Sequence, residues 1–365
     1  MKKSTSVLLV LLACLLLWAA SSRHAALLAT RIAGNLGEVE PPANAPPLLA
    51  FTTVALGGFR GLLADVLWLR AAYLQDKGAY IELVQLSDWI TKLEPRDAEV
   101  WNFHAWNMAY NVSFMMPELA DRWRWVENGI RLLRDEGIVY DPGDPRLYFD
   151  LGWIFLHKIG GTTDDANAYF KLQWIAEMTS LLGGPSPDYD ALAKKPEVVR
   201  RMREQYGLKP EIMREMDAEY GPLDWRVPQT HSLYWAYRGI REARGRSTLF
   251  CDRLLYQSMN ELFRHGRLVY RDNGREFGLA PDPRLFDKVC TTYEKAFAKY
   301  KGQNIRTAYG NFLREAVRLL HTVGEADKAH AAFGRLQERF PGPDTAAGFD
   351  AFIAKPPEGG SPRAQ

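Results

Sequence analysis

The sequence has 365 residues, of which 47% are hydrophobic and 25% charged, a balance typical of a globular chain with one large core or two ordinary ones. Its 46 basic and 44 acidic residues leave a net charge of +2 and are mixed along the chain without a basic stripe, which argues against nucleic acid as a partner. The three cysteines form no CxxC pair, so neither a cysteine metal site nor a c-type haem is expected.

The first segment of the chain has the pattern of a membrane-targeting helix. Lys2 and Lys3 precede an uninterrupted apolar run over residues 7–20, which neutral neighbours lengthen to nearly the span of a bilayer. Three fates fit this pattern: an uncleaved anchor, cleavage near Ser21, or lipid attachment at Cys14. We favour the anchor, because apolar character resumes after the run. In each case the basic end stays cytoplasmic, so the body is expected on the periplasmic side of the cytoplasmic membrane.

Helical periodicity dominates after this segment. Residues 35–49, GNLGEVEPPANAPPL, are too rich in proline for a regular helix and predict a spacer between the membrane and the body. We find no alternating β-branched run that would make a sheet beyond it. The fold class predicted for the body is therefore all-α.

The stretch KLEPRDAEVWNFHAWNMAY, residues 92–110, stops one helix and starts another within a few positions. Pro95 ends the first helix, which follows Gly78 and Tyr80, and Trp101 is expected to anchor the next one. A stop and restart this tight indicates a repeated helical hairpin. A third copy is predicted to start at Pro145, with Leu151–Gly152 on its first helix.

The middle of the chain is less regular. Residues 183–196, GGPSPDYDALAKKP, are rich in loop-forming residues. Helices are expected beyond them, in hairpins of irregular length, at 210–220, 229–243, 248–270 and 284–300.

The clearest hairpin is near the end of the chain, at residues 310–343. Its first helix carries one apolar stripe, and its second begins after a break at Gly324. Ala329 is small enough to let the two helices approach closely, Phe333 fills the space one turn later, and Pro341 ends the unit.

The intervals between Gly324, Ala329, Phe333 and Pro341 resemble those of the tetratricopeptide repeat, a helical hairpin of roughly 34 residues. The resemblance covers residues 64–180 and 310–343. It implies a right-handed solenoid whose concave groove binds partner peptides or helices. The whole pattern is also similar to bacterial membrane-anchored tetratricopeptide proteins, from which no activity carries over.

These observations predict seven segments. They are a signal or transmembrane helix (1–24), a spacer (25–50), tetratricopeptide-like repeats (51–182), a loop-rich break (183–209), irregular hairpins (210–303), a last repeat (304–345) and a disordered tail (346–365).

In a tetratricopeptide hairpin the first helix lines the groove. Because Trp101, Ala105 and Met108 follow the packing spacing, other positions of the same helices are expected to face the groove: Asn102, Trp106, Tyr110, Phe149, Trp153 and His157. Two tryptophans then fall at equivalent places in successive repeats. The alternative, that both pack against a neighbouring helix, stays open.

The densest polar stretch is GPLDWRVPQTHSLYWAYRG, residues 221–239. Asp224 beside His231 could do acid–base work, and the aromatic residues around them could bind a sugar. The alternative is a helix start, in which Asp224 pairs with Arg226, Pro228 opens the helix, and Thr230 or His231 bonds to backbone. We favour the helix start.

Other catalytic and metal-binding patterns are weak. The histidines form no HxxxH or HExxH motif, and a metal pair of His321 and His330 is not expected. No cofactor is expected either. Two hypotheses remain for Cys251 and Cys290, a disulfide or two buried free thiols, and we favour the thiols.

The sequence therefore predicts a non-catalytic, membrane-anchored scaffold or assembly factor for a cell-envelope complex. Its partners are expected to be proteins held in the groove. The rival hypothesis is an all-helical enzyme acting on envelope glycans through Asp224, Glu219 or His231.

Overall fold

The structure is a computed structural model of the whole chain and describes residues 23, 59–271 and 276–355. The chain divides into two compact units, Met1–Arg60 and Gly61–Gln365. The predicted membrane segment, the spacer and the residues after Lys355 lie almost wholly outside the described residues. In the described part, no helix combines the length and the apolar character needed to cross a membrane.

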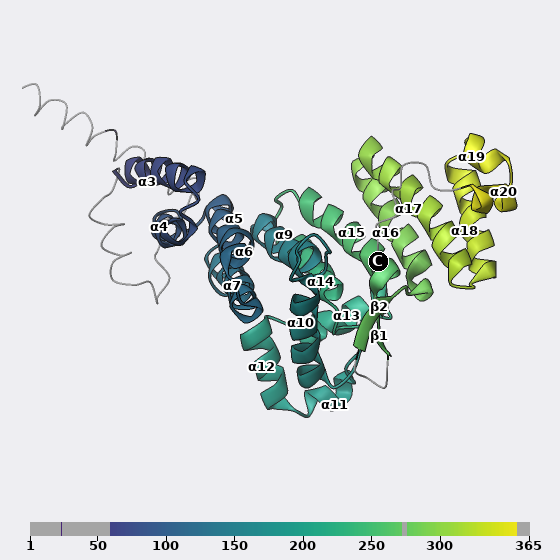
Figure 1. Cartoon of the computed structure of the whole chain (residues 1–365), viewed down its shortest axis with the longest axis horizontal. Helices are drawn as coiled ribbons and strands as arrows, with labels where there is room; N and C mark the ends of the chain where they lie inside the picture. The colour runs from purple at the N-terminus through teal and green to yellow at the C-terminus, as the bar shows by residue number, and fades with distance from the viewer. Residues whose placement is uncertain (1–22, 24–58, 272–275, 356–365) are drawn as a thin grey trace, which may run out of the picture. The chain divides into compact units, whose positions relative to one another are not determined.

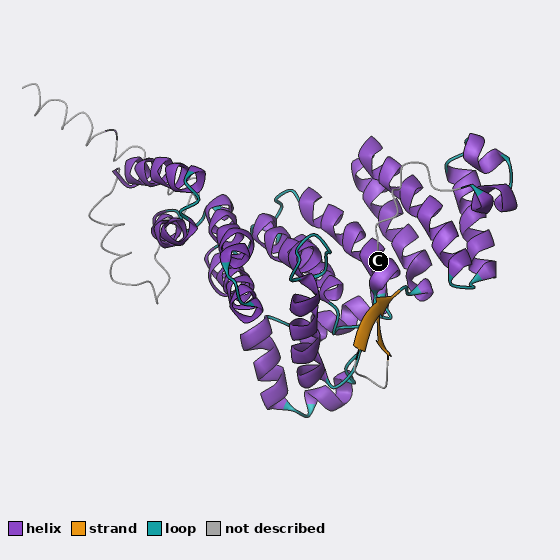
Figure 2. Cartoon of the chain, viewed as in Figure 1, coloured by secondary structure: helices purple, strands orange, loops and turns teal. Residues whose placement is uncertain are grey.

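The second unit is built mainly of helices, most of them joined in antiparallel pairs (Figures 1 and 2). The first half contains α3 (Phe59–Asp76), α4 (Tyr80–Leu93), α5 (Ala98–Trp106), η1 (Asn107–Val112), α6 (Ser113–Met115), α7 (Leu119–Arg131), η2 (Leu132–Gly137), α8 (Ile138–Tyr140), α9 (Pro145–Trp153), η3 (Ile154–Ile159) and α10 (Asn167–Leu182). The elements η1, η2 and η3 are π-helical turns.

The second half contains α11 (Tyr189–Ala193), α12 (Pro196–Tyr206), α13 (Pro210–Tyr220), α14 (Pro228–Glu242), α15 (Leu249–His265), β1 (Arg267–Arg271), β2 (Glu276–Ala280), the short 3₁₀ turn η5 (Pro283–Leu285), α16 (Phe286–Tyr300), α17 (Gln303–Thr322), α18 (Ala326–Arg339), α19 (Pro343–Ala346) and α20 (Phe349–Ala354). Each of the four helices expected in the middle of the chain is present, with α15 shorter than predicted.

The stop and restart around Pro95 has a simple structural cause. Asp97 caps α5 by accepting the backbone N–H of Glu99. Trp101 is buried one turn into the helix, and its Nε1–H donates to the carbonyl of Pro95 at 2.9 Å. Trp101 thus anchors the helix that follows Pro95, as the sequence predicts, and its indole also ties the end of one hairpin to the start of the next.

The spacing of the second and third hairpins departs from the tetratricopeptide interval. Matching positions of their first helices are 47 residues apart, not roughly 34. The second hairpin is longer because it runs through π-helical turns on both sides, η1 and η2, before the third begins at Pro145. A regular repeat of roughly 34 residues does not describe this part of the chain.

A central helix, α14, joins the two halves of the fold. It packs on α9, η3 and α15, and most of its residues are buried. Trp225, Tyr234 and Trp235 are completely or almost completely buried around it. The main core is therefore assembled from helices that are far apart in the sequence.

A two-stranded sheet corrects the prediction that the body is wholly helical. β1 and β2 are antiparallel, with Val269 opposite Gly278 (Figure 2). The helix expected over 248–270 ends at His265, and Gly266, a poor helix former, follows it. The sequence between the strands contains Asn273–Gly274, a common hairpin-turn pair that the sequence analysis missed. The strands themselves carry few β-branched residues, so no alternating pattern announces them.

The last hairpin matches its prediction closely. The stripe on α17 is buried, Gly324 adopts a left-handed φ of +82° between the helices, and Ala329 and Phe333 are buried on α18. The predicted disordered tail starts too early, however. Phe349–Ala354 form α20, because Phe352 packs into the main core and is 3% exposed.

Candidate functional site

The helices that open the second and third hairpins follow one plan. Asp97 caps α5 and Asp144 caps α9, each by accepting a backbone N–H two residues ahead. Each helix then passes into a six-residue π-helical turn, η1 or η3. Side chains at matching positions, such as Tyr110 and His157, are consequently 47 residues apart in the sequence.

These matching positions bring the predicted groove residues into one row of rings. Trp106 stacks on Tyr110 with ring centroids 3.9 Å apart. The hydroxyl of Tyr110 lies 3.4 Å from Nδ1 of His157, whose ring stacks on Trp153 at 5.2 Å. Phe149 lies 6.0 Å from Trp153 in a parallel arrangement. Five of the six predicted residues are therefore in sequential ring contact.

A residue that the sequence analysis missed extends the row. Phe250, in the first turn of α15, lies 5.4 Å from Phe149. No local pattern links the two helices, which meet at points such as the bond from the Cys251 thiol to the Pro145 carbonyl, 106 residues away. We call these six rings the aromatic strip: Trp106, Tyr110, Phe149, Trp153, His157 and Phe250.

The strip is partly open to solvent. Trp106 is 40% exposed and Phe250 45%, and the other four rings are half-buried. By contrast, the packing position of the same two helices is occupied by Trp101 and Tyr148, which are 2% and 1% exposed. The two sets of aromatic residues thus have different surroundings, as the helical spacing predicts.

The π-helical turns lie where the stacked rings are, and each pair is four residues apart, a spacing that makes side chains neighbours on a helix. In an α-helix, residues four apart drift by about 40° around the axis. An i→i+5 hydrogen bond, such as that from Gly160 N–H to the Phe155 carbonyl at the end of η3, widens the turn. Tyr110 in η1 and His157 in η3 each lie one turn beyond a tryptophan and stack on it, Tyr110 on Trp106 and His157 on Trp153.

A hollow of about 520 Å³ adjoins the strip at Trp106. Asn102, the sixth predicted groove residue, lines it together with Trp106. The other lining residues are Trp68, Gln75, Asp97, Glu99, Phe103 and Asn107. The hollow thus combines flat apolar surfaces with amide and carboxylate groups.

Buried charged side chains pack against the strip. The ammonium of Lys158 lies 5.1 Å from the centre of the Tyr110 ring and donates to Asp164, which also accepts from Arg122. Burial lowers the pKa of Lys158, although the bond to Asp164 opposes this. Burial and Lys158 together lower the pKa of His157, so its ring is uncharged at neutral pH.

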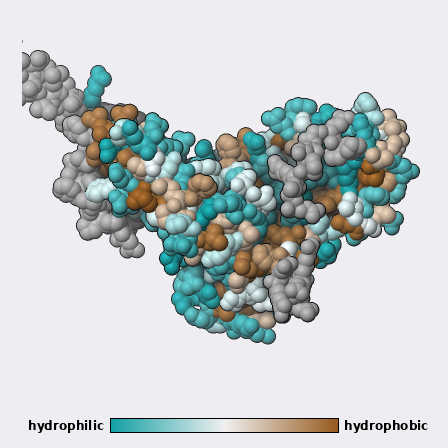
Figure 3. Space-filling model, in the orientation of Figure 1, coloured by the Kyte–Doolittle hydropathy of each residue, from teal (hydrophilic) through white to brown (hydrophobic). Residues whose placement is uncertain are grey.

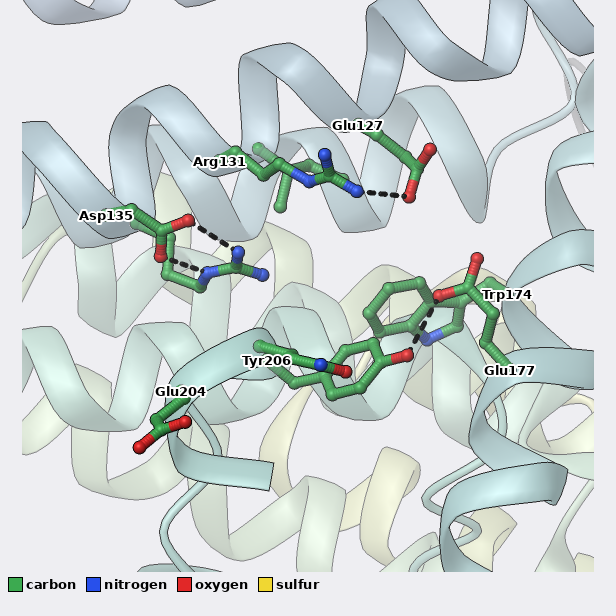
Figure 4. Close-up of a pocket in the computed structure, with 10 residues that line it drawn as sticks. Glu127, Arg131, Asp135, Trp174, Glu177, Glu204 and Tyr206 are labelled. Atoms are coloured by element: carbon green, nitrogen blue, oxygen red, sulfur yellow. Dashed lines mark hydrogen bonds and ion pairs between the residues drawn. The ribbon is translucent and has the colours of Figure 1, made fainter. Parts of the chain in front are cut away.

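A second concave site lies between α7, α10 and α12, with a volume of about 410 Å³ (Figure 4). Its charged side chains are already hydrogen-bonded, most of them to one another. Arg131 bonds Glu127, Arg134 bonds Asp135, and the Tyr206 hydroxyl donates to Glu177. Burial raises the pKa of Glu177, and the nearby Glu127 adds to the shift. The buried Nε1 of Trp174 has no hydrogen-bond partner among the described residues, but the charged side chains of the cleft are already paired, so we assign no ligand to it.

The polar stretch at 221–239 is a helix start. Asp224 pairs with Arg226 at 2.7 Å, and its carbonyl accepts from the hydroxyl of Thr230. His231 is fully buried among aromatic rings, and its Nε2 lies 2.8 Å from the carbonyl of Trp225. Burial lowers the pKa of His231 to about 4. The favoured interpretation is confirmed, and His231 is out of reach of a substrate.

The remaining candidate residues have packing roles. His321 and His330 both contact the ring of Phe349, at 5.9 and 3.9 Å. Within the described residues no cluster of His, Cys, Asp or Glu could hold a metal ion. Cys251 and Cys290 are buried free thiols, as predicted.

Comparison with known proteins does not assign the chain to a family. The sequence matches no protein-family profile, and no curated protein is similar to it. The function therefore has to be argued from the strip itself.

Proposed function

We propose that the chain is a non-catalytic scaffold that binds a segment of a partner protein along the aromatic strip. The observation that carries this proposal is the row of stacked, partly exposed rings supplied by equivalent positions of two repeated helices. Large aromatic rings provide much of the binding energy at protein interfaces. Because each ring here is held by its neighbour, little side-chain entropy is lost when a partner binds.

The surroundings of the strip favour a polypeptide over a fully apolar ligand. The hollow beside Trp106 offers the side chains of Asn102, Gln75 and Glu99 as hydrogen-bonding groups. A peptide or helix can place an apolar side chain on the rings while its polar groups meet this rim. Arg146, whose guanidinium lies 5.5 Å from the centre of the Phe250 ring, adds a cation at the other end of the strip.

The proposal includes the wider context predicted from the sequence. It places the body on the periplasmic side of the cytoplasmic membrane, as a tetratricopeptide-like solenoid that helps assemble an envelope complex. The charged and apolar pattern of residues 2–20 supports the location, and the spacing of the last hairpin supports the repeat type. A reporter fused after Gln365 should be active only outside the cytoplasm. Activity in the cytoplasm would refute the location.

Site-specific photo-crosslinking tests the binding surface in cells. A benzophenone amino acid at Asn102 should form a crosslink to a discrete partner, because Asn102 lies beside Trp106. The same amino acid at Gln85, an exposed position on α4, is the matched control. Equal crosslinking from both positions, or none from Asn102, would contradict the proposal.

A further inference from the structure

Helix α3 carries a row of large apolar side chains that face solvent. Leu62 is 60% exposed, Val66 54%, Leu69 74% and Tyr73 52%. Figure 3 shows the corresponding hydrophobic surface over α3. We call these four residues the α3 stripe. An apolar row of this length on a water-soluble surface marks an interaction site.

The stripe is not needed for the fold of its own hairpin. The opposite face of α3 is already buried, with Ala71 and Leu74 in a small core that includes Leu83 and Ile90 of α4. Trp68 joins this core and contacts Phe103 of α5 at 4.9 Å. The helix therefore has two apolar faces, and only one has a partner within the described part of the chain.

The spacing of the stripe is that of a coiled-coil seam. Its residues follow one another by alternating steps of four and three, with Leu62 and Leu69 at d positions and Val66 and Tyr73 at a positions. A β-branched residue at a with leucine at d favours two parallel strands. The seam is short, but α3 is already held as a helix by α4, so pairing does not have to supply the cost of helix nucleation.

Charges on either side of the stripe fit the same arrangement. Asp65 occupies a g position and Arg70 an e position. In a parallel pair a g residue meets the e residue five positions later on the partner helix, which sets Asp65 opposite Arg70 of a second copy. An antiparallel pair would instead set the Arg70 flank against itself. Within the chain Arg70 lies 3.7 Å from Glu82, with both side chains more than half exposed, so this contact is weak and does not occupy Arg70 fully.

We propose that two copies of this chain associate through a parallel pairing of their α3 helices. The occupant of the stripe is the same stripe of a second copy, related by a two-fold axis parallel to the helices. This proposal goes beyond the binding function of the aromatic strip and does not depend on it.

Cysteine crosslinking of the full-length chain in its native membranes tests the pairing. The background is Cys14→Ser, since Cys251 and Cys290 are buried. In a parallel pair each d position meets its own copy, so Leu62→Cys and Leu69→Cys should each form a disulfide-linked dimer on mild oxidation. Ile81→Cys, an apolar and 43% exposed position on α4, is the matched control and should not. The absence of dimer from both stripe positions would overturn the proposal, as would linkage from only one of them.

Charge reversal separates pairing from other occupants of the stripe. Asp65→Arg should lower crosslinking through Leu69→Cys about fivefold, and adding Arg70→Asp should restore it. Both side chains are exposed, so these changes leave the fold intact. A double variant that stays as weak as the single one would contradict the parallel register. If Leu69→Lys instead releases the chain from membranes and no variant crosslinks, the stripe lies on lipid, and pairing is refuted.

Discussion

Asp150 lies next to Phe149 of the strip, buried on α9, and burial raises the pKa of its carboxyl group to about 8. The guanidinium of Arg146, 3.9 Å away, opposes this increase by lowering the pKa. Asp144 and Glu99 raise the pKa further. Its Oδ2 atom has no hydrogen-bond partner among the described residues. This shift favours the protonated, neutral form of the side chain at pH 7.

This burial predicts a pH dependence of stability. Below about pH 4 the carboxyl group is protonated in both the folded and the unfolded chain. Between pH 4 and pH 8 the unfolded chain releases the proton and the folded chain keeps it, so this group makes stability fall across that window. Asp150→Asn removes the effect. The free energy of unfolding should therefore decrease less between pH 5 and pH 8 in Asp150→Asn than in the wild type. The difference between the two decreases should be at least about 1 kcal/mol.

Urea unfolding at the two pH values measures the difference. Asp327→Asn, at an exposed position of α18, is the control and should follow the wild type. An unchanged pH dependence in Asp150→Asn would show that the carboxyl group is ionised in the folded chain.

Ala329 tests the helical register of the last hairpin. It is completely buried where α18 packs on α17, so Ala329→Leu should overpack the hairpin and cost about 1–3 kcal/mol of stability. The neighbouring Lys328 is only partly buried, with its side chain 43% exposed, and Lys328→Leu should change stability by less than about 0.5 kcal/mol. Thermal melting of the two variants compares them. Equal losses of stability in the two variants would mean that α18 does not contact α17 through the face that carries Ala329.

At the scale of elements, what the sequence predicts depends on whether the pattern is local. The hairpin at 310–343 and the anchoring role of Trp101 both rest on residues within a few turns of one another, and these predictions are confirmed. The β-hairpin was missed because its strands carry few β-branched residues, so no alternating pattern announces them. The contribution of Phe250 to the strip was missed because α9 and α15 meet only through the tertiary fold.

The contact of α9 with α14 and α15 makes a prediction about glycine. A Cβ atom added at Gly152 would lie 2.6 Å from Cδ2 of Leu254 and 3.1 Å from the carbonyl oxygen of Ser232. Gly152→Ala should therefore cost about 1–3 kcal/mol, because the helices must move apart. Gly334 lies in α18 with nothing within 4 Å of the added atom, so Gly334→Ala should stabilise by about 0.5–1 kcal/mol. Chemical denaturation should show that Gly152→Ala lowers the free energy of unfolding and that Gly334→Ala raises it. An unchanged free energy of unfolding in Gly152→Ala would contradict the close packing.

At the scale of the whole molecule, the aromatic strip follows from repetition. Two helices with the same cap, length and π-helical turn present equivalent rings, and α15 adds a further ring to the same row. The half-exposure of these rings was predictable from helical spacing. The π-helical turns in which Tyr110 and His157 lie were not, since no sequence pattern announced them.

The most direct test of the aromatic strip is the affinity of one double variant for the partner segment identified by crosslinking at Asn102. Trp106→Ala with Trp153→Ala should weaken binding by about 2 kcal/mol or more, roughly thirtyfold, while the far-UV circular dichroism signal is unchanged. Trp89→Ala removes a 50% exposed tryptophan outside the strip and should bind like the wild type. Each tryptophan variant is melted first, because loss of a core tryptophan would cost about 3–5 kcal/mol of stability. Thirtyfold weaker binding by a stably folded double variant is the result that the strip predicts. Wild-type affinity in that variant, or a core-sized loss of stability in both single variants, would contradict it.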